Sequence, residues 1–212
     1  MTIRAPTKAR FLLAASTACA LAACSTQEEP AGMDPEEFAQ VAEDCLLMVW
    51  GSQDTRDEAF DRANDVADGG AISCATGTSP SQFEAALKAI REAAKARDKP
   101  RMLAEIGIPM LYIDAKGERR EMAPEAIDAL FDEVFSEDML ARLENADLKD
   151  LTVIPSEGAY LELGSVWLVA EPGQRPRIVT VNAQALGEAA EAARRDAEAD
   201  KGVEITEKPA EG

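Results

Sequence analysis

The first 23 residues restrict which part of this chain can fold. Three basic residues and no acid precede residue 11 (Arg4, Lys8 and Arg10), and the mostly apolar stretch FLLAASTACALAA fills residues 11–23. That stretch is shorter than the roughly 20 apolar residues that a membrane-spanning helix needs. A basic segment followed by a short apolar one is typical of a secretory signal, which is removed from the mature protein. We therefore expect the fold to be built by the later residues.

The end of this segment, LAAC at residues 21–24, resembles the bacterial lipobox. The resemblance implies a lipoprotein whose Cys24 carries diacylglycerol and becomes the mature N-terminus, so that the lipid bilayer is a partner of the chain. Two or more acyl chains give stable anchoring. Ser25 stands where an aspartate typically holds such proteins in the inner membrane, which implies attachment to the inner leaflet of the outer membrane, facing the periplasm. The alternative is an ordinary signal with an incidental cysteine.

Export also decides the chemistry of the other cysteines. Cys19 leaves with the signal and Cys24 is lipidated, so Cys45 and Cys74 remain in an oxidising compartment, where an even pair usually forms a disulfide. We predict a Cys45–Cys74 bridge, which in the chain-entropy model contributes roughly 3.5 kcal/mol for a loop of this size. The alternative, a reactive thiol, needs an activating base that the sequence does not obviously offer.

The composition excludes several classes of function. Removing three basic residues with the signal takes the formal charge from −18 to −21, and nucleic acids repel so acidic a chain. The chain has no histidine, which excludes Ser-His and Cys-His catalysis and imidazole metal sites. Neither metal-ligand spacing nor a Gly-rich phosphate loop is present, so we expect no cofactor. The 189 residues that follow the signal suffice for one ordinary domain with a core.

The beginning of the mature chain is predicted to be a tether followed by a helical segment. Residues 24–33 are polar with Pro and Gly, which is typical of a linker. Over residues 34–80 we predict a helical segment that contains the disulfide. Its first helix, 34–50, starts with an Asp cap and Pro35 and carries apolar residues at helical spacing, with Cys45 on the buried face.

A second helix, about 55–67, is predicted to carry an acidic stripe. Its aspartates recur at steps of three or four residues (Asp54, Asp57, Asp61, Asp65 and Asp68). Like charges at that spacing weaken a helix by a few tenths of a kcal/mol per pair. The stripe is interpreted as a solvated face, with a calcium site as the alternative. We expect the GG pair at 69–70 to end this helix and residues 71–80 to form a loop that holds Cys74.

The rest of the chain is predicted to fold as an α+β domain over 81–182, followed by an Ala-rich, weakly amphipathic C-terminal helix and loose tail over 183–212. The patterns favour helices at 81–99, 123–135 and 136–147, a hairpin at 108–122 and four β-rich segments between 151 and 182. Both faces of the strand around Trp167 are largely apolar, so we expect that strand to be covered on both sides.

Within 81–182, AIREAAKARDKPRMLAEI, DALFDEVF and LELGSVWLV…RIVTVN resemble the nuclear-transport-factor-two-like (cystatin-like) cone and domains of uncharacterised bacterial envelope proteins. The resemblance implies a curved antiparallel sheet packed against helices, here preceded by the N-terminal helices. Another α+β sandwich is the alternative fold.

Three functions remain open at this point. The first is a non-catalytic envelope lipoprotein that binds a small ligand or an envelope protein partner. The second is an isomerase- or dehydratase-like enzyme, because members of that fold pair a carboxylate base with a tyrosine in an apolar cavity. The candidate catalytic residues share strand faces in pairs, Tyr112 with Asp114 and Tyr160 with Glu162. If Leu111, Ile113, Leu161 and Leu163 instead face the core, these residues are merely solvated. The third is docking of a basic partner on the acidic N-terminal helices.

Overall fold

The computed structural model describes residues 34–171 and 174–204, with the side chains of residue 193 and residues 196–204 left out. The predicted signal, the lipidation site Cys24 and the tether at 24–33 lie outside the described residues. The compact unit begins at Asp34.

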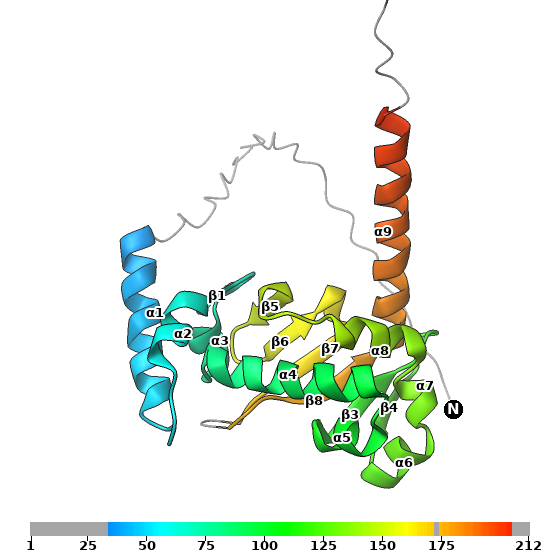
Figure 1. The fold of residues 1–212 in the computed structure, drawn as a ribbon, viewed down its shortest axis with the longest axis horizontal. Helices are drawn as coiled ribbons and strands as arrows, with labels where there is room; N and C mark the ends of the chain where they lie inside the picture. The colour runs from blue at the N-terminus through cyan, green and yellow to red at the C-terminus, as the bar shows by residue number, and fades with distance from the viewer. Residues whose placement is uncertain (1–33, 172–173, 205–212) are drawn as a thin grey trace, which may run out of the picture. The chain divides into compact units, whose positions relative to one another are not determined.

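Helices precede, interrupt and follow one main sheet (Figure 1). The helices are α1 (Pro35–Trp50), α2 (Glu58–Asn64), α3 (Ile72–Thr76), α4 (Pro80–Ala96), α5 (Lys99–Ala104), α6 (Pro124–Ala129), α7 (Phe131–Val134), α8 (Glu137–Glu144) and α9 (Ala183–Glu204), with short 3-10 turns η1 (Leu148–Asp150) and η2 (Glu162–Gly164). The strands are β1 (Val66–Ala67), β2 (Gly70–Ala71), β3 (Ile106–Ile113), β4 (Arg119–Met122), β5 (Leu151–Ile154), β6 (Gly158–Leu161), β7 (Val166–Val169) and β8 (Arg177–Asn182).

The main sheet has six strands in the order β4-β3-β8-β7-β6-β5, which confirms the α+β class. The expectation of a purely antiparallel sheet is wrong in one place, because β3 and β8 run parallel, with Tyr112 opposite Val181. The remaining pairs are antiparallel. The last strand, β8, lies between β3 of the early hairpin and β7. It is parallel to β3 and antiparallel to β7.

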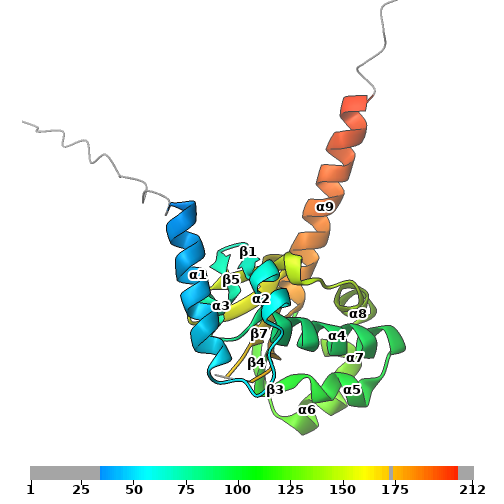
Figure 2. The same cartoon turned by 60° about the vertical axis from the view of Figure 1, so that its left-hand side comes forward.

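Helices cover one face of this sheet. Figures 1 and 2 show four helices on the same side of the strands, namely α4, α5, α7 and α8. Ser79 caps α4 by accepting from the backbone N–H of Gln82, and Pro80 takes the first helical position. The apolar stripe of α4 is fully buried in the core, notably Phe83, Leu87 and Ile90. The helical spacing of these residues therefore decides which side of the sheet becomes the core.

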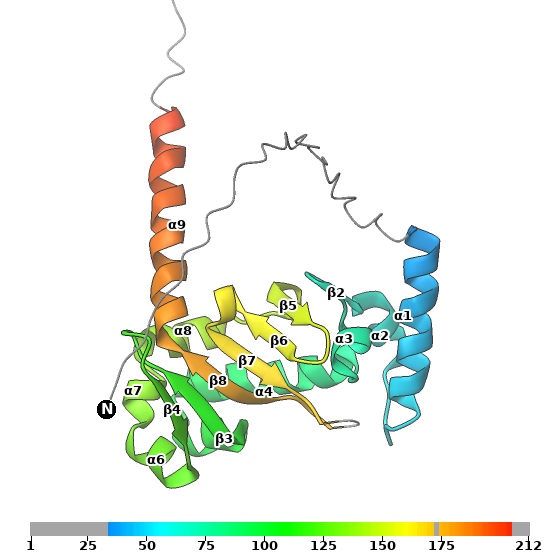
Figure 3. The ribbon, with the colours of Figure 1, turned by 180° about the vertical axis from the view of Figure 1, so that it is seen from behind.

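The two faces of the sheet differ in burial. One row of paired residues crosses the sheet on the helix side and is buried: Tyr112, Val181, Val166, Leu161 and Leu151. The opposite row is half-buried: Leu111, Thr180, Trp167, Tyr160 and Thr152. No described helix lies over strands β6–β8 on that side (Figure 3).

Two sequence expectations are corrected by this burial pattern. The strand around Trp167 is covered on one side only, because Val166 and Leu168 are buried whereas Trp167 is half-buried. Tyr112, which alternation placed on the wet face, is 3% exposed, while Leu111 and Ile113 are half-buried. Because both faces of these strands carry apolar residues, the sequence did not decide which face is buried. The buried face is the one on which α4 packs.

The N-terminal segment contains the predicted Cys45–Cys74 disulfide, with a Cα–Cα distance of 5.1 Å. It joins α1 to α3, so Cys74 lies in a short helix and not in the loop expected over 71–80. Cys45 is half-buried and Cys74 is exposed, so the bridge does not face the core as predicted. Ile72 and Ala75, on the other side of α3, belong to the main hydrophobic core.

The acidic stripe is a solvated face only in part, because Asp54, Asp57 and Asp68 are exposed whereas Asp61 and Asp65 are buried. Asp61 is fully buried and accepts hydrogen bonds from the Trp50 indole N–H and the Ser81 backbone N–H, both at 2.7 Å. Asp65 is 3% exposed and accepts from the backbone N–H of Ser73 at 2.7 Å. Each carboxylate therefore satisfies donors that the fold buries, which helical spacing alone did not reveal.

The end of this segment also differs from the expected helix. The α2 helix stops at Asn64, and the GG pair belongs to the β1–β2 hairpin, where Ala67 pairs with Gly70. Gly69 has a φ of +88°, and a Cβ there would lie 2.2 Å from the Val153 carbonyl oxygen. The Val153 backbone N–H donates to the Asp68 carbonyl at 2.7 Å. Only glycine allows the hairpin to approach β5 this closely.

Candidate functional site

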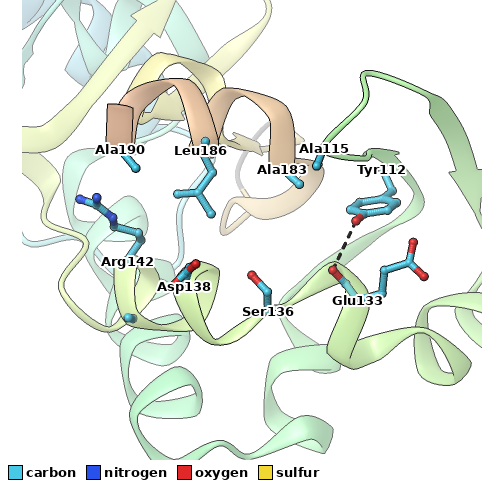
Figure 4. Close-up of a pocket in the computed structure, with 11 residues that line it drawn as sticks. Tyr112, Ala115, Glu133, Ser136, Asp138, Arg142, Ala183, Leu186 and Ala190 are labelled. Atoms are coloured by element: carbon cyan, nitrogen blue, oxygen red, sulfur yellow. Dashed lines mark hydrogen bonds between the residues drawn. The ribbon is translucent and has the colours of Figure 1, made fainter. Parts of the chain in front are cut away.

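A pocket of about 470 Å³ lies between β3, the α7–α8 region and the start of α9 (Figure 4). Its apolar wall is formed by small residues of α8 and α9, namely Ala141, Ala183, Gly187 and Ala190, together with the buried Leu186. The Asn182 side chain caps α9 by accepting from the Ala185 backbone N–H at 3.0 Å. This cap fixes the helix directly after β8, so its first turns form one wall.

Tyr112 closes one end of the pocket. Its hydroxyl donates to the Glu133 carbonyl oxygen at 3.3 Å (Figure 4), and the Arg120 guanidinium lies 5.3 Å from the centre of its ring. Burial raises the pKa of Tyr112, and the nearby Glu133 carboxylate raises it further. At neutral pH this tyrosine is therefore a neutral hydroxyl, which is suited to hydrogen bonding and not to acting as a base.

The charged groups of the pocket are mostly engaged. Glu133 accepts from the Arg120 guanidinium at 2.6 Å, and Arg142 donates to Glu162 at 3.0 Å. Ser136 caps α8 by accepting from the Met139 backbone N–H at 3.3 Å. Asp138, in the first turn of α8, has no hydrogen-bond or ion-pair partner among the described residues.

The four predicted catalytic residues do not meet in one place. Tyr112 lines the pocket, but β3 ends at Ile113, so Asp114 falls in the following turn. There Asp114 accepts from the backbone N–H groups of Glu118 and Lys116, and these hydrogen bonds lower its pKa. A carboxylate with a lowered pKa is a weak base.

The second predicted pair is divided between two environments. Tyr160 lies on the helix-free face, where its ring is 4.9 Å from that of Trp167. Strand β6 ends at Leu161, so the alternation that would place Glu162 beside Tyr160 stops. Glu162 and Leu163 adopt the left-handed conformation, with φ of 38° and 54°. This turn brings Glu162 to Arg142 at the edge of the pocket.

Comparison with known proteins gives a plain result. No family model, no curated protein and no solved structure matches this chain. A functional conclusion therefore rests on the sequence and on the geometry of the described residues.

Two further findings concern metal ligands and membrane-crossing helices. Within residues 34–171 and 174–204, no group of three or more Cys, Asp or Glu side chains is arranged to hold a metal ion. In the same part of the chain, no helix combines the length and apolarity that crossing a bilayer requires.

Sequence patterns missed most of the pocket. Ser136, Asp138 and Arg142 were assigned only to a helix between 123 and 147, and the alanines of α9 only to a weakly amphipathic helix. The one available signal was that weak amphipathicity, which fits a helix that contacts the domain through its first turns. Tyr112 was found because tyrosine near a carboxylate is a recognisable pair.

Proposed function

We propose that this chain is a lipid-anchored envelope protein, facing the periplasm, that binds a small ligand in the pocket between β3, α7–α8 and α9. The lipobox-like LAAC at residues 21–24 supports the anchor, and the observation that carries the ligand-binding part is the make-up of this pocket. Its volume of about 470 Å³ lies within the range of small-molecule sites, which combine apolar walls with a few polar groups. Alanine, glycine and leucine supply the walls here, and Tyr112, Ser136 and Asp138 supply polar groups.

Binding is better supported than catalysis. Of the four residues proposed for an isomerase-like mechanism, only Tyr112 lines this pocket. Glu133 accepts from the Tyr112 hydroxyl through its backbone carbonyl, and its carboxylate is held by Arg120. Docking of a basic partner on the acidic N-terminal segment is also less supported, because Asp61 and Asp65 are buried.

The order of elements supports a relationship to the nuclear-transport-factor-two-like cone at the level of fold. Residues 81–182 give a helix pair, a hairpin, short helices and a four-stranded meander on one sheet. The helices lie on one face of that sheet, as in the proposed cone. The pocket opens beside the end of β3, where helix α9 begins.

The membrane anchor is tested by changing Cys24 to serine. Without the thiol no diacylglycerol can be attached, so we expect the variant to lose palmitate labelling and to accumulate as an uncleaved or soluble form. Metabolic labelling with palmitate followed by fractionation measures both effects, with the Cys19→Ser variant as the control that keeps its label. Undiminished labelling of Cys24→Ser would refute the anchor.

The ligand pocket is tested by filling it. Gly187 lines the pocket and a Cβ there meets no atom within 4 Å, so Gly187→Met adds a flexible side chain at the pocket wall without a backbone clash. We expect this variant to lose at least about tenfold in affinity for the neutral apolar probe N-phenyl-1-naphthylamine, because the probe's space is occupied. Fluorescence titration of the mature chain from residue 25 measures the affinity.

The matched control is Glu191→Met, which adds the same side chain at an exposed position of α9 outside the pocket. It should bind the probe like the unmodified chain, and both variants should keep its melting temperature. Equal probe binding by Gly187→Met and the unmodified chain would rule out this pocket as the ligand site.

A further inference from the structure

The charges around the pocket do not balance. Arg142 is the single cation among the residues that line it, and its guanidinium is already paired with Glu162 at 3.0 Å. Glu133 is compensated by Arg120. The carboxylate of Asp138 is left without a compensating cation in the described part of the chain. The unbalanced charge of the pocket is therefore negative.

The positive charge of Arg142 is already compensated by Glu162, which accepts from its Nη1 nitrogen, so an anionic ligand would have to share this cation. The second carboxylate oxygen of Glu162 is buried and has no hydrogen-bond partner among the described residues. Taking Arg142 away would leave this carboxylate without its cation, and an uncompensated, partly buried charge is costly. The Arg142–Glu162 pair thus acts against carboxylate or phosphate ligands.

Two hydroxyl groups of the pocket keep the capacity to accept hydrogen bonds. The Tyr112 hydroxyl uses its proton on the Glu133 carbonyl and keeps its lone pairs. Ser136 accepts one bond from Met139 and has further acceptor capacity. Figure 4 shows Ser136 and Asp138 on the α8 side of the pocket, facing the small apolar residues of α9. A ligand with N–H donors and a positive charge fits this arrangement.

We infer that the pocket selects a small organic cation, an ammonium ion carrying an apolar body, with Asp138 as its counter-charge. This inference rests on the proposed ligand-binding function and specifies its ligand class. The ammonium lies at the Asp138–Ser136 side, and the apolar body lies against Ala183, Leu186 and Gly187. The formal charge of −21 on the mature chain attracts such cations to the protein from a distance.

The test compares three probes of equal length and different charge: hexylammonium, hexanol and hexanoate. Each is titrated into the mature chain from residue 25, and binding is followed by NMR on the methyl groups of Ala141 and Ala183. We expect hexylammonium to bind about fivefold more tightly than hexanol, the upper end of the gain from an exposed ion pair. Hexanoate should bind most weakly. The advantage of hexylammonium should shrink as salt is raised.

Two variants locate the charge that is responsible. Asp138→Asn keeps the shape of the side chain and should make hexylammonium and hexanol bind equally, with hexanol unaffected. Asp132→Asn removes the same charge from an exposed position of α7 outside the pocket and should preserve the fivefold difference. If Asp132→Asn abolished the difference as well, the general field of the chain and not Asp138 would select the cation, and the inference would be overturned.

The probes also separate this inference from the proposed function. Saturable binding of all three with equal affinity, or preference for hexanoate, would overturn cation selection and leave the ligand pocket standing. If none of the three shifted the alanine methyl signals in a saturable way, the pocket would not be a ligand site and both proposals would fall.

Discussion

Replacing Cys45 and Cys74 together with serine should lower the free energy of unfolding by about 2–5 kcal/mol. The bridge joins residues 29 apart in sequence, and the loop that it closes contains α2 and the β1–β2 hairpin. Without the bridge the unfolded chain gains conformational freedom, while the folded state keeps its other contacts. Urea denaturation of the oxidised chain and of the double serine variant measures the difference.

Two controls accompany this experiment. The unmodified chain treated with reductant should match the serine variant, because both lack the covalent link. Alkylation of the oxidised protein under denaturing, non-reducing conditions should detect no free thiol at Cys45 or Cys74. A stability loss below about 1 kcal/mol would mean that the buried Trp50–Asp61 hydrogen bond and the core contacts of α3 already hold this segment in place.

Asp65 should make the protein more stable at mildly acidic pH. Burial raises the pKa of this carboxyl from 3.8 to about 6, an effect opposed by its hydrogen bonds from Ser73 and reinforced by the charge of Asp61. The unfolded chain releases the proton at lower pH than the folded chain does. Folding stability from this group is therefore fully present below pH 4 and is lost as the pH rises through about 6.

The variant Asp65→Asn isolates this contribution. Its amide oxygen can still accept from the Ser73 backbone N–H, but it carries no titrating proton. Between pH 4 and pH 7 the unmodified chain should lose about 2 kcal/mol of stability relative to the variant, since each unit of pKa shift corresponds to about 1.4 kcal/mol and the loss begins just below pH 4. Other carboxylates titrate in both proteins and cancel. Parallel pH profiles for the two proteins would contradict a raised pKa at Asp65.

Local patterns predicted most of the secondary structure. The helical spacing of Phe83, Leu87 and Ile90 gave α4, and strands separated by Pro and Gly gave β5 to β8 close to their observed bounds. Helix 123–135 was predicted as continuous, but it divides at Leu130 into α6 and α7. These features depend on neighbours in sequence, which is why they could be read directly.

What could not be predicted depends on partners far away in the chain. The parallel pairing of β3 with β8 joins segments about seventy residues apart, which no local spacing encodes. Asp61 looks like part of a solvated stripe until Trp50 and the N-terminus of α4 are placed around it. The pocket likewise combines β3, α8 and α9, whose side chains acquire a shared role only after the sheet forms.

The contact between the β1–β2 hairpin and β5 has a consequence for self-association. An uncovered sheet edge is a template on which strands of other molecules can add. At the β5 edge, Asp68 takes up part of the hydrogen-bonding capacity of the strand. Its backbone carbonyl accepts from the Val153 N–H, and its carboxylate accepts from the Thr152 hydroxyl at 3.1 Å. The opposite edge, β4, is four residues long and carries exposed charges at Arg119, Arg120 and Glu121. Both ends of the sheet are thereby guarded against strand-to-strand aggregation.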